Sequence, residues 1–161
     1  MKKKKGQNTF NFLYIEDDQG AIKLMKIYLN LINSFKSKFD SAFYLKDGIK
    51  KLENNNFDIL FLDLYLPDHV DSPEATIRQI QKDFPNQQII VISSYEDNEF
   101  ASKLIEMGIS DYLYKEKINA STLEKAILFS LSRVGKGLAK DATPNQRIKD
   151  ADPPTGPSTS N

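Results

Sequence analysis

Residues 12–18 read FLYIEDD, four apolar side chains in succession followed by three acids. The same layout returns at residues 59–63 (ILFLD), 89–93 (IIVIS) and 112–115 (YLYK), where short apolar runs stop at an aspartate, a serine and a lysine. Apolar runs of about four residues without polar alternation indicate strands covered on both faces, as in a parallel sheet between helical layers. Ligands of such sheets bind outside the carboxyl ends of the strands. The chain therefore brings carboxylates, a hydroxyl and an ammonium group to one edge of one sheet.

Segments with helical spacing separate these runs. We expect strands over 38–45, 58–62, 88–92 and 111–114 in addition to the first run, and helices after Asp18, over 47–54, from Pro73 to before Pro85, from about 98 to Gly108, and over 120–133. The faces expected to be buried on the last two helices carry Ala101, Leu104 and Ile105, and Leu123, Ile127, Leu131 and Val134. This alternation predicts a doubly wound α/β fold with a five-stranded parallel sheet and five helices. Spacing leaves the strand order open, and the flavodoxin-like order 2-1-3-4-5 would set the first strand beside the third.

The 161 residues have room for one domain, which we place at residues 10–134. Residues 1–9 are expected to form a flexible basic N-terminus, because Lys2–Lys5 are followed by polar residues. Residues 135–161 contain no aromatic residue and four of the seven prolines. Such a segment buries too little apolar surface to offset its ordering entropy, so we expect a disordered tail that is too short for an output domain.

The formal net charge of zero hides an uneven distribution. Residues 6–134 hold 14 basic and 19 acidic residues, a net charge of −5. Because phosphate neutralisation supplies most nucleic-acid affinity, we expect no nucleic acid among the partners. The chain lacks the long apolar stretch of a membrane span or signal peptide, so no membrane is expected either. The absence of cysteine is consistent with a cytoplasmic protein.

If the first and third strands are neighbours, Glu16, Asp17 and Asp63 converge within a few ångströms. Three carboxylates so close repel one another unless a cation is present, and oxygen ligands without histidine or thiolate suit Mg²⁺. Lys115 supplies a counter-charge for an anion, and Ser93 can donate to a phosphoryl oxygen. Together these groups predict a site that accepts a phosphoryl group.

In four blocks, the sequence resembles the receiver domains of two-component response regulators, of which CheY is the stand-alone type. The blocks are Tyr14–Asp18, residues 58–68 (DILFLDLYLPD), residues 91–94 (VISS) and residues 111–115 (DYLYK). The resemblance covers about residues 10–134, and all four blocks in order at these spacings are specific. It implies the flavodoxin-like strand order 2-1-3-4-5.

The resemblance also implies a role for each site residue. Asp63 would be the phosphoacceptor, and Lys115 would bind the phosphoryl oxygen. Mg²⁺ would be held by Glu16, Asp17, Asp63 and the backbone carbonyl of Tyr65. Ser93 would move towards the phosphoryl group, and Tyr112 would turn inward in response. The domain would then catalyse only its own phosphorylation and dephosphorylation.

The implied partners are a histidine kinase or histidine phosphotransfer protein and a downstream protein that binds the face of the fourth helix, fifth strand and fifth helix. A phosphorelay shuttle, which passes the phosphoryl group to a second histidine, would use the same residues. A magnesium-dependent aspartyl phosphatase is an alternative from another class, although Tyr65 stands where such enzymes need a second acid. A flavin-binding flavodoxin relative is less consistent with the acids, which would repel the cofactor phosphate.

Three features depart from the family pattern. Glu116 follows Lys115 where the family usually has proline, so we expect the last loop to differ in geometry. Residues 68–72 (DHVDS) replace the usual glycine-bearing turn, and His69 is expected to be an exposed loop residue. No output module is expected after residue 134. Two tyrosines flank the predicted acceptor region, Tyr65 and Tyr95, and we hypothesise that their rings slow hydrolysis of the acyl phosphate.

Overall fold

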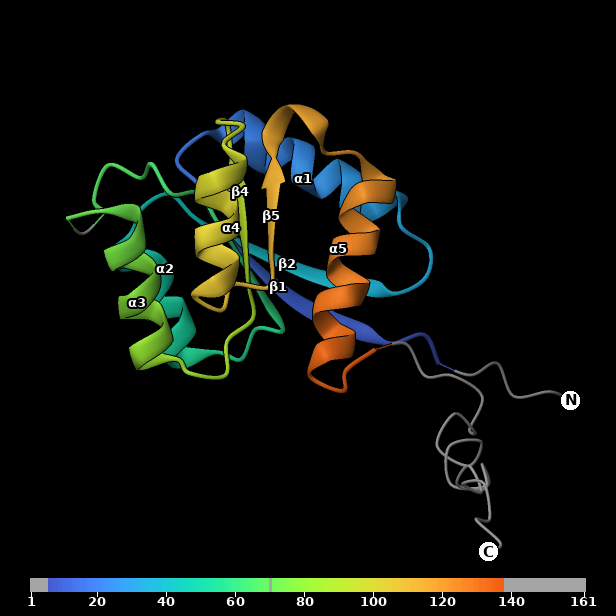
Figure 1. Cartoon of the computed structure of the whole chain (residues 1–161). Coiled ribbons are helices and arrows are strands. Elements are labelled where there is room, and N and C mark those ends of the chain that lie inside the picture. The colour runs from blue at the N-terminus through green and yellow to red at the C-terminus, as the bar shows by residue number, and fades with distance from the viewer. Residues whose placement is uncertain (1–5, 70, 138–161) are drawn as a thin grey trace, which may run out of the picture.

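The computed structural model describes residues 6–69 and 71–137. Within them, five parallel strands form one sheet in the order β2-β1-β3-β4-β5 (Figure 1). The strands are β1 (Thr9–Ile15), β2 (Lys36–Ala42), β3 (Ile59–Leu62), β4 (Ile89–Ser93) and β5 (Asp111–Tyr114). The helices are α1 (Gln19–Leu31), α2 (Leu45–Asn54), α3 (Pro73–Asp83), α4 (Asn98–Glu106) and α5 (Ala120–Arg133), with a 3₁₀ turn η1 (Lys115–Lys117) before α5. The predicted flavodoxin-like fold and strand order are confirmed.

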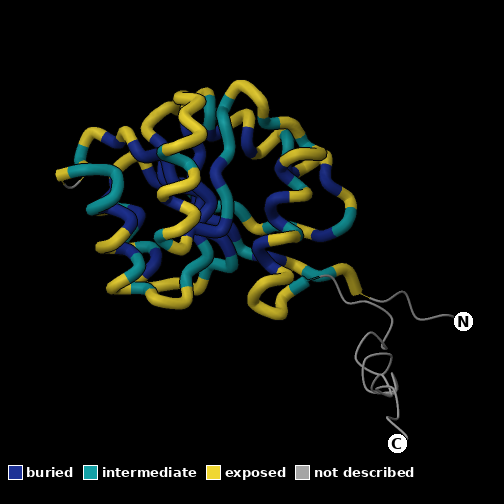
Figure 2. Tube along the Cα trace, viewed as in Figure 1, coloured by how far each residue is buried: buried dark blue, intermediate teal, exposed yellow. Residues whose placement is uncertain are grey.

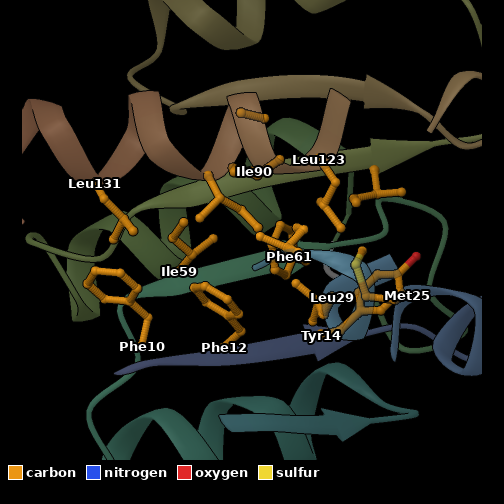
Figure 3. Close-up of a cluster of buried hydrophobic side chains, with 14 of the residues drawn as sticks. Phe10, Phe12, Tyr14, Met25, Leu29, Ile59, Phe61, Ile90, Leu123 and Leu131 are labelled. Atoms are coloured by element: carbon orange, nitrogen blue, oxygen red, sulfur yellow. The ribbon is translucent and has the colours of Figure 1, made fainter. Parts of the chain in front are cut away.

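The sheet separates two apolar cores. One core lies under α1 and α5, where Phe12 and Phe61 on the strands meet Met25 of α1 and Leu123 of α5 (Figure 3). The other lies under α2, α3 and α4 and contains the alternate strand residues, such as Leu60. Successive strand residues point to opposite faces, so an unbroken apolar run supplies both cores. All four residues of β3 are buried, which explains its run of four apolar side chains.

Helix α2 approaches the sheet closely at Gly48. A Cβ atom at this position would lie 2.3 Å from Cδ1 of Ile15, which is fully buried on β1. The glycine therefore lets α2 pack against β1, the strand that Glu16 follows.

The second strand occupies Lys36–Ala42 rather than the predicted 38–45. It pairs with β1 from Thr9↔Lys36 to Ile15↔Ala42, and the chain then turns through the exposed Phe43 and Tyr44. Leu45 is buried as the first residue of α2, so the apolar cluster after the strand belongs to the turn and the helix.

Two side chains expected in the core are exposed instead. Ile105 is 43% exposed, because α4 turns its neighbour Leu104 towards the sheet. Val134 is 40% exposed, because it lies at the C-cap of α5 beyond the buried Leu131. Much of the outward surface of α4 is likewise exposed in Figure 2. The predicted disordered tail falls mainly on residues 138–161, and the lysine run lies within 1–5, both outside the described residues.

Candidate functional site

Three carboxylates meet at the carboxyl edge of the sheet. Glu16 and Asp17 follow β1 and Asp63 follows β3, and these two strands are paired. One carboxylate oxygen from each residue lies within 4.8 Å of the others. Glu16 and Asp63 are buried, whereas Asp17 is exposed. The proximity expected from the sequence is therefore present, with one acid accessible to solvent.

Lys115 supplies the positive charge beside this cluster. It follows β5 directly, and its Nζ lies 2.5 Å from Glu16 Oε2 and 3.5 Å from Asp63 Oδ2. Burial opposes the charge of the ammonium group, but the hydrogen bond to Glu16 and the attraction of Asp63 outweigh it, so the pKa of Lys115 is raised. The lysine thus compensates part of the negative charge of the site.

Two residues close to Glu16 in the sequence also donate hydrogen bonds to its carboxylate. The hydroxyl of Tyr14 donates to Glu16 Oε2 at 2.9 Å, and the backbone N–H of Asp18 donates to Oε1 at 3.0 Å. Burial, followed by the charge of Glu16, raises the pKa of Tyr14, which keeps its hydroxyl protonated as a donor. This role was not predicted from the sequence, because Tyr14 lies within an apolar run that is typical of a buried strand. Its spacing of two from Glu16, which puts both side chains on one face of the strand, is the available signal.

Asp63 is held through the backbone on both sides. Its own N–H donates to the carbonyl of Ile15 at 3.0 Å, and the N–H of Tyr65 donates to Asp63 Oδ1 at 3.2 Å. These bonds, with Lys115 beside Oδ2, fix a buried carboxylate at the end of β3.

The donor set of the cluster fits a hard divalent cation. Burial, then the hydrogen bond and charge of Glu16, raise the pKa of Asp17, so the crowded acids disfavour ionisation there. A cation among the carboxylates would relieve this repulsion, and three oxygen donors within 4.8 Å suit Mg²⁺ better than softer metals.

Ser93 and Tyr112 are linked through the backbone of Tyr95. The N–H of Tyr95 donates to Ser93 Oγ at 3.1 Å, and the Tyr112 hydroxyl donates to the Tyr95 carbonyl at 3.2 Å. Ser93 is fully buried as the last residue of β4, and Tyr112 is 9% exposed. Burial raises the pKa of Tyr112, so its hydroxyl stays a donor.

The junction after β5 forms a 3₁₀ turn over Lys115–Lys117, which includes Glu116. Lys117 forms an ion pair with Glu96 and lies over the ring of Tyr114 at 5.6 Å. These contacts tie the last loop to the loop after β4.

The acidic loop after β3 has a contact that the sequence did not predict. Both carboxylate oxygens of Asp68 accept backbone hydrogen bonds from α2, from Leu45 at 2.7 Å and Lys46 at 3.0 Å. The N-cap residue of α2, Tyr44, makes no side-chain cap bond, so Asp68 caps that helix from the neighbouring loop. His69 is exposed, as expected.

Fold and site together define a doubly wound α/β protein with a cluster of three carboxylates beside a lysine at the carboxyl edge of its sheet. Residues 12–128 match the model of the response regulator receiver domain. The chain belongs to the response regulator receiver domain family of two-component signalling proteins. This membership favours a phosphoacceptor over the phosphatase and flavodoxin alternatives.

Individual proteins show the same relationship. The chain is 37% identical over 83 residues to the response regulator protein VraR of Staphylococcus saprophyticus, a match covering 51% of this chain and 38% of VraR. A CheY-like receiver domain protein of Methanospirillum hungatei has the same fold, with a TM-score of 0.65, 21% identity, and 80% and 98% of the two chains covered. The chain spans between 30% and 58% of the length of curated relatives such as VraR.

The expectation that no nucleic acid is bound receives no support from the comparisons. RcsB of Salmonella enterica serovar Typhimurium, in a structure bound to promoter rprA, matches with a TM-score of 0.66 and 19% identity. The match covers 77% of this chain and 62% of RcsB, and at this identity it shows the fold alone. Among residues 6–69 and 71–137, no helix has the length and apolar character needed to span a membrane.

Proposed function

We propose that this chain is a phosphorylation-controlled signalling switch in which Asp63 accepts a phosphoryl group from a phosphohistidine in a Mg²⁺-dependent reaction. The donor would be a histidine kinase or a histidine phosphotransfer protein. The observation that carries the proposal is the cluster of Glu16, Asp17 and Asp63, with oxygens within 4.8 Å, beside Lys115.

Asp63 is the nucleophile in this proposal. One carboxylate oxygen attacks the phosphorus in line, the new P–O bond forms as the P–N bond breaks, and the imidazole leaves with the electron pair. Glu16, Asp17, Asp63 and the backbone carbonyl of Tyr65 would hold the Mg²⁺, which supplies charge neutralisation for the phosphoryl oxygens. Burial of Asp63 favours the reaction because it limits water around the attacking oxygen.

Lys115 changes partners during the reaction. In the described state its ammonium group pairs with Glu16 and Asp63, and its raised pKa keeps it charged at neutral pH. Once the phosphoryl group is attached, the lysine binds a phosphoryl oxygen, because that oxygen carries more negative charge than the acyl oxygens of the resulting acyl phosphate.

Ser93 and Tyr112 carry the response. The Ser93 hydroxyl donates to the phosphoryl group, which disturbs its bond with the N–H of Tyr95. The Tyr112 hydroxyl donates to the Tyr95 carbonyl, so Tyr112 turns inward when Tyr95 moves. The face of α4, β5 and α5 then binds a downstream protein. A phosphorelay shuttle would use the same residues and differs only in its second partner, and we infer a cytoplasmic location for either.

The test is phosphorylation of the full chain with acetyl phosphate and Mg²⁺, followed by intact mass spectrometry. We expect one added phosphoryl group in the wild type and none in Asp63→Ala, while Asp71→Ala, which removes an exposed acid of the next loop, behaves as wild type. Modification that persists in Asp63→Ala, or continues undiminished after chelation of divalent ions, would contradict the proposal.

A further inference from the structure

A groove of about 700 Å³ lies between the first turns of α3 and α4, next to the acidic site. Its aromatic wall consists of Tyr65, Tyr95 and Phe100. The rings of Tyr65 and Tyr95 meet edge to face, with centroids 5.0 Å apart, and these residues are 50% and 62% exposed. Exposed aromatic rings gathered in a groove are typical of a binding surface.

Three carboxylates line the same groove, those of Glu74, Glu96 and Asp97. Backbone hydrogen bonding, followed by the hydrogen bond from Lys103, lowers the pKa of Glu74, so this group is ionised at neutral pH. Glu96 pairs with Lys117. Aromatic faces next to carboxylates are the groups that bind an organic cation.

The surroundings leave this negative charge available. The N-termini of α3 and α4 attract anions, but an acidic side chain already occupies each of them. Glu74 lies in the first turn of α3, and Asp97 accepts a hydrogen bond from the N–H of Phe100 in α4 at 2.9 Å. The two lysines that pair with the groove acids are both more than half exposed in their side chains. Because exposed ion pairs contribute little, an incoming cation can replace them.

We propose that this groove binds a segment of a protein partner that carries an arginine beside an apolar residue. The planar guanidinium can stack on the ring of Tyr65 or Tyr95 while it pairs with a groove carboxylate through two hydrogen bonds. The neighbouring apolar side chain packs against Pro73 and Phe100, which also line the groove. The groove borders the α4, β5 and α5 face, because two of its lining residues on α4 contact β5. Asn98 accepts a hydrogen bond from the Tyr114 hydroxyl at 2.8 Å, and the ring of Phe100 lies against that of Tyr112.

The groove is linked to the phosphorylation site through Tyr95. The backbone of this residue is bonded to Ser93 on one side and to Tyr112 on the other. Movement of either partner therefore moves the ring that forms the groove wall. This regulatory part of the proposal rests on the proposed function.

The test uses the full chain labelled with ¹⁵N and the peptide Ac-Ala-Arg-Leu-Ala-NH₂. A matched peptide replaces arginine by citrulline, which keeps the shape of the side chain and removes its charge. We expect saturable shifts of the amide signals of Tyr65, Glu74, Tyr95 and Phe100 with the arginine peptide, and about threefold weaker binding of the citrulline peptide. Equal binding of both peptides, or shifts centred elsewhere, would overturn the proposal.

Two variants and one control locate the binding. Tyr95→Leu and Glu96→Gln are each expected to weaken the arginine peptide about threefold, whereas Tyr44→Leu, which removes a 45% exposed tyrosine after β2, leaves it unchanged. Amide spectra of the free variants show whether each is folded. Loss of affinity in Tyr44→Leu equal to that in Tyr95→Leu would refute the site.

The regulatory link is tested by repeating the titration with beryllofluoride and Mg²⁺. We expect the affinity for the arginine peptide to change at least about threefold. If beryllofluoride leaves the Asp63 amide unshifted, the proposed function fails while peptide binding at the groove stands. If Asp63 shifts and the affinity does not, the link between groove and site is refuted.

Discussion

Tyr14 illustrates how one residue serves both the core and the site. Its ring packs edge to face against Phe61 at 6.2 Å, and its hydroxyl donates to Glu16. A phenylalanine would keep the packing but leave an oxygen of the buried Glu16 carboxylate without this donor, and lost hydrogen bonds to charged groups cost more than neutral ones. A tyrosine two residues before an acid at the end of a strand is therefore informative.

Asp17 gives a prediction for the metal-free protein. Its pKa is raised, so its carboxylate form is less favourable in the folded chain than in the unfolded chain. The associated loss of stability is absent at low pH, where the group is protonated in both states, and develops as the pH rises through the unfolded and folded pKa values. Because Asp17 is exposed, screening keeps the effect small, and Asp17→Asn should raise the free energy of unfolding by about 0.5 kcal/mol at neutral pH.

Urea unfolding with chelated divalent ions measures this effect. The gain in stability of Asp17→Asn should vanish at about pH 3, where carboxylates are protonated. Addition of Mg²⁺ should stabilise the wild type more than the variant, since one proposed ligand is missing. A destabilised Asp17→Asn protein at neutral pH without Mg²⁺ would show that repulsion does not govern this site, and Asp71→Asn controls for the loss of an exposed charge.

Tyr65 and Tyr95 give a prediction about the lifetime of the phosphorylated state. Their rings contact each other at 5.0 Å, and each lies two residues after a site residue, Asp63 or Ser93. We expect these rings to crowd the path of attacking water, so the double variant Tyr65→Ser/Tyr95→Ser should lose its phosphoryl group about three to ten times faster, equivalent to roughly 0.6–1.4 kcal/mol of barrier. Decay is followed by intact mass after removal of the donor, with Tyr44→Ser as the control. Unchanged or slower decay in the double variant would count against the shielding role.

Among the strands, the sequence was most informative where a strand is buried on both faces. All residues of β3, and those of β4 before Ser93, are apolar and buried, so the existence and the polar endings of both strands were predicted. The edge strand β2 (KSKFDSA) has no such run, and the apolar residues that follow it led to a prediction shifted towards Leu45. Its position depends on pairing with β1, which a local pattern does not contain.

The cap that Asp68 supplies to α2 has a measurable value. Loss of a side-chain N-cap costs about 1 kcal/mol, and here one carboxylate binds two N–H groups. Asp68→Ala should lower the free energy of unfolding by about 1 kcal/mol and speed amide exchange at Leu45 and Lys46. The matched variant Asp71→Ala removes the same charge from the same loop. Equal effects of the two substitutions would show that charge, and not the cap, is responsible.

Across the assembled sheet, the sequence predicted which site residues would meet but not how they pair. Asp63 and Glu16 could be placed together because carboxyl ends of neighbouring parallel strands share an edge. The side chain of Lys115 has several rotatable bonds, so its choice of Glu16 and Asp63 depends on three strands at once. The roles of Asp68 and Tyr95 likewise depend on contacts with distant segments, the first turn of α2 for Asp68 and Tyr112 of β5 for Tyr95.

The two cores share every strand, so we expect them to unfold together. Ile127 of α5 and Ile77 of α3 are fully buried on opposite faces of the sheet, and their substitution by valine removes one methylene group in each core. Each variant should lose about 0.5–1.5 kcal/mol of stability. Each should still unfold in a single transition, so that the unfolding curves from circular dichroism and from tyrosine fluorescence coincide. Because β3 supplies Phe61 to one core and Leu60 to the other, loosening one face exposes the strand that supports the opposite face. Faster amide exchange confined to α1 and α5 in Ile127→Val would show instead that the two faces open independently.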